Sequence, residues 1–182
     1  MNLYIFLIIV TFISGLLQIP ALQSLTIWNA DLIQSGQLWR VISGNFTHTN
    51  LYHLLMNMAA LWVMGFLFKP SAKSLLSLLV LLSAVVGCAL LATEIDIYAG
   101  LSGTLHGLFA FYAAIEVSRG LRSSWLLILG VIAKVGYEQV FGAQESTAKL
   151  IEASVAIDAH LAGCIAGVIA ATAVISYRKL AR

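Results

Sequence analysis

The residues that could do covalent chemistry in this 182-residue chain are one serine and a set of histidines in apolar surroundings. Ser102 lies between Gly100 and Gly103, where the sequence predicts the start of a helix. Free backbone N–H groups and the positive end of the helix dipole point outward there and could hold an oxyanion. His160 lies in another apolar stretch, and a histidine within hydrogen-bond reach could take the serine proton. The structural alternatives are an N-cap serine beside packing glycines and a satisfied interior histidine.

Two other polar clusters stand out in the sequence. His53 and Asn57 are four residues apart and so share one helix face. Hydrogen bonding between helices would explain them about as well as a functional role. Trp39 and Arg40 lie in the first long loop, where on their own they are typical of an interfacial anchor.

The glycine spacing predicts that the serine and His160 approach each other. Gly103 and Gly107 form one GxxxG step beside the serine, and Gly163 and Gly167 form another beside His160. Small residues let helix backbones pack closely. If the two glycine faces meet, the hydroxyl and the imidazole come within hydrogen-bond reach.

The elements that must position these residues are apolar helices. The chain is 60% hydrophobic and 10% charged, which excludes an ordinary water-soluble domain. A membrane span needs about 20 mostly apolar residues. We expect an all-α, polytopic membrane protein that forms one domain over residues 1–182. Its six predicted spans are about 3–19, 51–68, 74–92, 101–117, 124–142 and 155–177.

The basic residues predict the orientation of the chain. Seven of the ten lie between spans two and three, between four and five, or after span six: Lys69, Lys73, Arg119, Arg122, Arg178, Lys179 and Arg182. Short cytoplasmic loops hold such an excess, so both termini should be cytoplasmic. The net charge of +2 is then a topology signal and indicates no nucleic-acid partner.

Spans two, four and six then run inward from the outer face. The polar residues that fall in the first third of these spans are His53, Asn57, Ser102, His106 and His160. Independent structural roles would not require this shared depth, which favours one common site.

These motifs together resemble the rhomboid family of intramembrane proteases. The matching patterns are Trp39-Arg40, His53-x-x-x-Asn57, Gly100-x-Ser102-Gly103 and His160-x-x-Gly163-x-x-x-Gly167, in order along nearly the whole chain. A single GxSG would be weak, because soluble hydrolases use a similar pattern.

The resemblance implies a six-helix rhomboid-like bundle and a serine endopeptidase with a Ser-His dyad that lacks the third carboxylate of a triad. Ser102 would be the nucleophile and His160 the base, with the oxyanion held by the Ser102 N–H, His53 and Asn57. Span five and the outer end of span two would form a lateral entrance for substrate. Trp39 and Arg40 would brace the first loop, about residues 20–50, which would lie partly in the outer leaflet.

One departure from the family pattern is informative. Rhomboids usually carry an aromatic residue four positions after the serine, stacked on the catalytic histidine; here it is His106. His106 shares a helix face with Ser102 and could compete as the base, although such a residue points along its own helix. Ser-Gly-x-x-His-Gly looks like the rhombosortase branch, which is implied to remove C-terminal Gly-Gly-type tails from exported bacterial proteins.

That resemblance also sets the expected partners and location. They are membrane lipid and exported substrates with a C-terminal transmembrane tail, in a bacterial inner membrane, with the site opening to the periplasm. No cofactor or metal is expected. Lys134 and Glu138, four residues apart in span five, are either an ion pair or a recognition element. The rival functions are a non-catalytic client-binding scaffold and a metal-binding protein built on the histidines.

Overall fold

The computed structural model describes residues 1–181 as a bundle of helices, so Arg182, the last residue of the predicted domain, lies outside the described residues. The long helices are α1 (Leu3–Leu16), α5 (Leu51–Phe68), α6 (Ala72–Ala89), α7 (Ser102–Ser118), α8 (Ser124–Phe141) and α10 (Ile157–Leu180). The short helical elements are α2 (Pro20–Thr26), α3 (Ala30–Gln34), α4 (Arg40–Ser43), η1 (Gly44–Phe46), η2 (Leu90–Ala92) and α9 (Glu145–Ile151).

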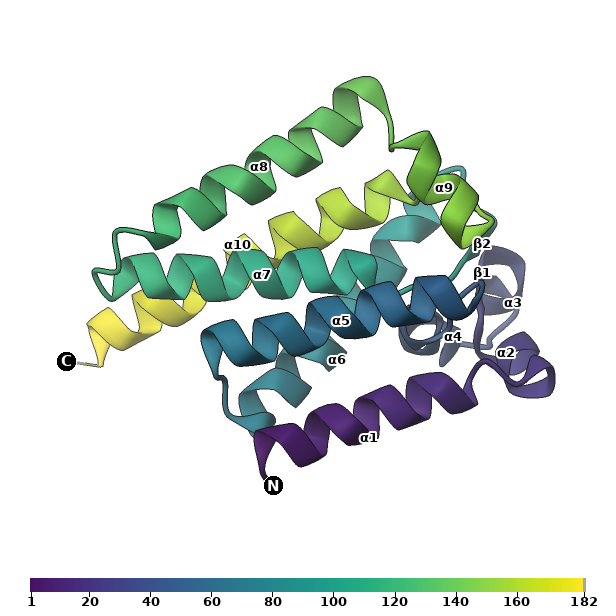
Figure 1. Ribbon diagram of the computed structural model, residues 1–182, viewed down its shortest axis with the longest axis horizontal. Helices are drawn as coiled ribbons and strands as arrows, with labels where there is room; N and C mark the ends of the chain where they lie inside the picture. The colour runs from purple at the N-terminus through teal and green to yellow at the C-terminus, as the bar shows by residue number, and fades with distance from the viewer. Residues whose placement is uncertain (182) are drawn as a thin grey trace.

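The long helices run alternately in two directions. Helices α5, α7 and α10 run one way and α1, α6 and α8 the other, and α8 diverges from α7 toward the end where α9 begins (Figure 1). The first turns of α5, α7 and α10 therefore lie at one end of the bundle, which is where the sequence predicted that the polar residues of these helices meet.

The number of membrane spans remains partly a prediction. Within residues 1–181, four helical segments are long and apolar enough to cross a membrane: α5, α6 with η2, α8 and α10. A fifth is reached only if α1 and α2, bent by 102°, count as one span. Helix α7 has 17 residues and α1 has 14, so six full spans are not confirmed.

The segment between α1 and α5 folds against the bundle instead of forming a loose loop. Trp28 and Asn29 form the short strand β1, which pairs antiparallel with β2 (Ile97–Tyr98). The Trp28 side chain is fully buried, and its indole N–H donates to the Gly87 carbonyl at 2.9 Å. This small sheet, absent from the sequence prediction, ties the first loop to the segment that leads into α7.

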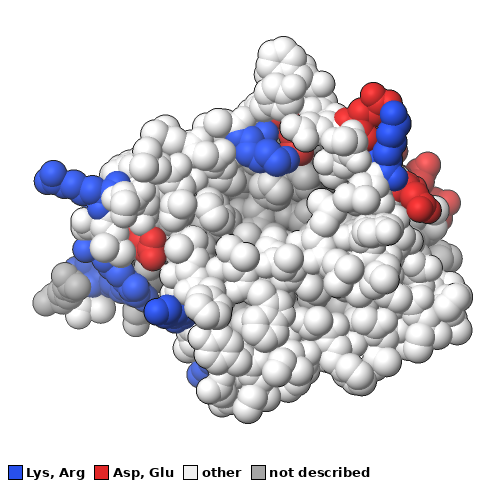
Figure 2. Space-filling view, in the orientation of Figure 1, with Lys and Arg blue, Asp and Glu red and all other residues white. Residues whose placement is uncertain are grey.

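Charged side chains are segregated along the bundle. Most of the visible Lys and Arg lie at the end that holds the C-terminus, while most of the visible Asp and Glu lie at the opposite end (Figure 2). The pattern agrees with the uneven distribution of basic residues along the sequence.

Candidate active site

Two glycine steps bring α7 and α10 into backbone contact. A Cβ added at Gly103 would lie 2.8 Å from the Ala159 carbonyl oxygen, and one at Gly107 would lie 2.7 Å from that of Gly163. Methyl groups at Gly163 and Gly167 would overlap the carbonyls of Gly103 and Gly107. Only glycine allows this approach, and the two faces meet as their spacing predicts.

Ser102 and His160 are joined across this contact. Ser102 is the first residue of α7, and its Oγ lies 2.9 Å from Nε2 of His160. His160 lies in the first turn of α10 and is buried, with 4% of its surface exposed. The sequence-predicted nucleophile and base are therefore within hydrogen-bond distance.

Glu138 of α8 contacts the other nitrogen of the same imidazole, which the sequence analysis did not predict. Its Oε2 lies 2.8 Å from Nδ1 of His160, while its Oε1 forms an ion pair with Lys134. The Lys134–Glu138 ion pair, one of the two alternatives from the sequence, is thus present, and Glu138 also contacts His160. A carboxylate in an apolar span was the available signal, because such a group needs a partner.

His106 stacks on His160. The two ring centroids are 4.1 Å apart and the planes differ by 21°. Nδ1 of His106 lies 2.8 Å from the Ser102 carbonyl oxygen, which can only accept, so this nitrogen carries a hydrogen. The structure therefore places His106 against the face of His160, with its Nδ1 engaged by the backbone of α7 and not by the Ser102 hydroxyl.

The predicted oxyanion residues, His53 and Asn57, lie on α5, and His53 is beside Gly100, just before α7. An added Cβ at Gly100, whose φ is +129°, would lie 2.6 Å from the His53 ring. Asn57 is buried, and its Nδ2 donates to the His53 carbonyl at 3.0 Å. The Tyr98 hydroxyl donates to the Gly100 carbonyl, and burial raises the pKa of Tyr98 above its usual range, so it remains a donor.

A cavity of about 1000 Å³ opens beside these groups. It is lined by Ser102, His160, His53, Asn57, Lys134 and Glu138, among others. Helix α9 also contributes to the lining and is held over α5, because Thr49 Oγ1 donates to the Ile151 carbonyl at 2.6 Å. The polar groups therefore converge on a space that a peptide segment could occupy.

Trp39 and Arg40 lie away from this cavity and hold the first loop. Arg40 is buried, and its guanidinium donates to the carbonyls of Ile27 and Ser24 at 2.7 and 3.1 Å. The Trp39 side chain is exposed, and its indole donates to the Leu25 carbonyl at 3.0 Å. The structure thus places both in contact with the C-terminal end of α2.

His48 is buried just before α5, outside the predicted spans, and its burial should make the stability of the protein depend on pH. Burial, with the His53 ring at 5.1 Å, lowers the pKa of His48 from 6.5 to about 3. The unfolded chain then binds this proton below pH 6.5 while the folded chain does not, so the free energy of unfolding falls as the pH drops from about 6.5 toward 3. We expect His48→Leu to flatten this part of the curve of melting temperature against pH in detergent. Identical slopes for the two proteins would contradict this assignment.

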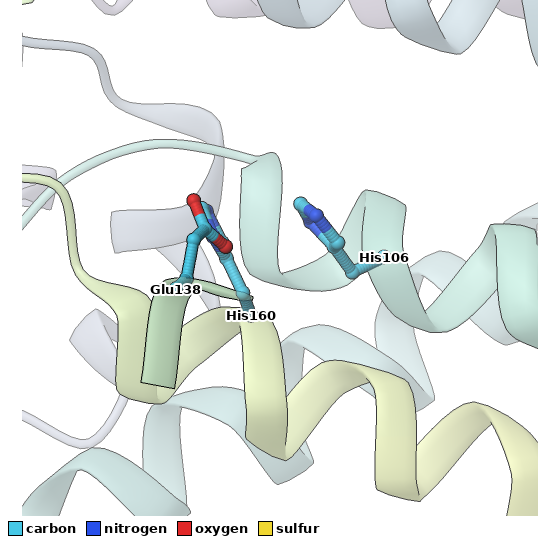
Figure 3. A group of neighbouring side chains, drawn as sticks. All are labelled: His106, Glu138 and His160. Atoms are coloured by element: carbon cyan, nitrogen blue, oxygen red, sulfur yellow. The ribbon is translucent and has the colours of Figure 1, made fainter. Parts of the chain in front are cut away.

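The trio of His106, Glu138 and His160 also has the composition of a metal site. Their donor atoms lie within 4.8 Å of one another, and the side chains come from three helices (Figure 3). The lone pairs of an imidazole lie in the ring plane, however, and the two stacked rings direct them side by side instead of toward one point. The geometry therefore fits two stacked rings, each hydrogen-bonded to other groups, better than metal coordination.

Apolar helices that hold a part-buried serine–histidine contact beside a cavity define a polytopic helical membrane protein with a hydrolase-like site. The family model described as Rhomboid domain matches residues 35–177. The chain therefore belongs to the rhomboid family, whose members are generally intramembrane serine proteases. No individual curated protein matches it.

Proposed function

We propose that this protein is an intramembrane serine endopeptidase. The observation that carries the proposal is the 2.9 Å contact between Ser102 Oγ and His160 Nε2 at the wall of a cavity large enough for an extended peptide. The family to which the chain belongs supports the same reaction. A client-binding scaffold would not need this contact.

In the proposed reaction the Ser102 oxygen attacks the scissile carbonyl carbon as its proton passes to Nε2 of His160. The carbon–nitrogen bond then breaks, and His160 returns the proton to the leaving amine. Water attacks the resulting ester with His160 again as the base, which frees the acid and restores the hydroxyl. The Ser102 N–H, His53 and Asn57 would hold the oxyanion, and one such donor is typically worth about 10²–10³ in rate.

The position of the site suggests cleavage near the outer membrane face. Ser102 begins α7 at the end opposite Arg119, which follows the last residue of that helix. If the basic end is cytoplasmic, as its charge favours, both termini face the cytoplasm and the cavity opens to the periplasm. We propose a bacterial inner membrane as the location of the protein, as in the rhombosortase branch.

The substrates we propose are exported proteins with a C-terminal transmembrane tail, as in the rhombosortase branch. Ser102-Gly103-x-x-His106-Gly107 supports this branch, since His106 stacks where the wider family has an aromatic side chain. Small residues such as Gly-Gly before the tail would ease local unwinding of a substrate helix.

The test uses purified protein in liposomes with a reporter whose C-terminal tail carries Gly-Gly, an apolar span and basic residues. We expect a fluorophosphonate probe to modify Ser102, located by peptide mass spectrometry, and to abolish reporter cleavage. Cleavage that continued after complete modification of Ser102 would end the proposal.

A further inference from the structure

Glu138 is the one acidic side chain of α8, and it is almost fully buried beside the base. Its side chain is 6% exposed, whereas that of Lys134 is 53% exposed. A carboxylate in an apolar bundle is costly unless both oxygens are paired, and here each oxygen has its own partner. The arrangement holds one carboxylate oxygen on Lys134 and aims the other at His160.

The contact with Glu138 decides which nitrogen of His160 carries the hydrogen. An ionised carboxylate only accepts hydrogen bonds, so Nδ1 of His160 must donate to it. Nε2 is then left with a lone pair, and the Ser102 hydroxyl must donate to it across 2.9 Å. This is the tautomer that a general base for Ser102 requires.

We propose that Glu138 is a positioning residue that completes a Ser102–His160–Glu138 triad, with Lys134 orienting its carboxylate. This rests on the proposed function and changes it, because the resemblance implied a dyad alone. The carboxylate fixes the ring and its tautomer in the resting enzyme. It then faces the imidazolium that forms when His160 takes the serine proton, and Glu138 itself stays ionised.

The amide variant separates this role from a structural one. In Glu138→Gln the ammonium of Lys134 needs an acceptor, so the amide oxygen turns to Lys134 and the amide N–H₂ turns to His160. Nδ1 must then accept, which puts the hydrogen on Nε2 and leaves Ser102 without a base. In Glu138→Ala, water can still accept from Nδ1. The isosteric variant should therefore be the slower of the two.

The experiment measures the rate at which a fluorophosphonate probe labels the purified protein, which needs no natural substrate. We expect a fall of about 10³-fold for Glu138→Ala and about 10⁴-fold for Glu138→Gln, as when a triad carboxylate is lost. Lys134→Met in the Glu138→Gln background frees the amide to turn its oxygen toward His160, and should raise the rate at least about tenfold.

The pH profile is a second readout that a structural ion pair would not move. The charged groups around the imidazole are Lys134 and Glu138 from α8, with the histidines His106 from α7 and His53 from α5. Without the carboxylate the imidazolium loses its counter-charge, so the acid limb of the labelling rate for Glu138→Ala should move to lower pH by about one unit.

Glu116→Gln is the matched control, because this α7 carboxylate accepts from Ser124 Oγ at 2.6 Å and lies outside the site. It should label at the wild-type rate. A Glu138→Gln rate equal to or above that of Glu138→Ala would overturn the proposal, and a double variant no faster than Glu138→Gln would remove Lys134 from it. If Ser102→Ala is inert while Glu138→Gln behaves as wild type, this inference alone fails. If Ser102→Ala cleaves the reporter normally, the proposed function fails.

Discussion

Ser102→Ala and His160→Ala should each lower the rate of reporter cleavage by about 10⁶-fold, and the double variant should be no slower than either. The two side chains share one proton across 2.9 Å, so removing either member removes the function of both. Such strong non-additivity is the signature of groups that act as a unit. The measurement is single-turnover cleavage of the tailed reporter in liposomes.

The control for this result is Ser118→Ala, which changes a serine of the same helix at its other end. Its hydroxyl donates only locally, to the Ile115 carbonyl at 2.7 Å, so cleavage should be unchanged. Losses that added in the double variant would mean that the serine and the histidine act separately. A His160→Ala variant that kept most of its rate would point to another base, with His106 the nearest candidate.

The contact between Ser102 and His160 could be anticipated from sequence because backbone spacing encodes it. A polar residue beside each GxxxG step, on helices of the same direction, leaves little freedom once the glycine faces meet. The apolar lengths likewise predicted the positions of α5 and α8 within a few residues, since the requirement for internally paired backbone is strict in a membrane. Local pattern was sufficient for both features.

The role of Glu138 could not be anticipated in this way, because it depends on where α8 lies relative to α10. No small-residue step marks that pairing, and the two glycines of α8, Gly130 and Gly136, have open space around them. The i, i+4 spacing allowed either an ion pair with Lys134 or a recognition role, and the structure has the ion pair. The contact between Glu138 and His160, in contrast, is set by tertiary packing alone.

The pairing of β1 with β2 was missed for a similar reason. Two-residue strands carry no alternation of polar and apolar residues that a sequence could display. Here the register follows from the burial of Trp28 opposite Tyr98, which depends on the closeness of α6.

Gly163→Ala should lower the cleavage rate by about 10²-fold, and Gly163→Leu should bring it to background. A methyl group at this position overlaps the Gly103 carbonyl oxygen, one residue after the nucleophile. Backbone cannot yield as a flexible side chain does, so α7 and α10 must separate, at a cost of about 1–3 kcal/mol in stability. A displacement of about 1 Å between reacting groups is enough for a hundredfold loss. The measurements are reporter cleavage and thermal unfolding in detergent.

Gly136→Ala isolates this effect from the general consequence of replacing a helical glycine. Gly136 lies in α8, and an added Cβ there meets nothing within 4 Å, so activity should be retained and stability should rise slightly. If Gly163→Ala kept full activity, the close approach of α7 and α10 would not be what holds Ser102 against His160. The graded response from alanine to leucine matters most here. A site assembled by backbone contact should lose more activity as the side chain at position 163 grows larger, although Ser102 and His160 themselves are unchanged.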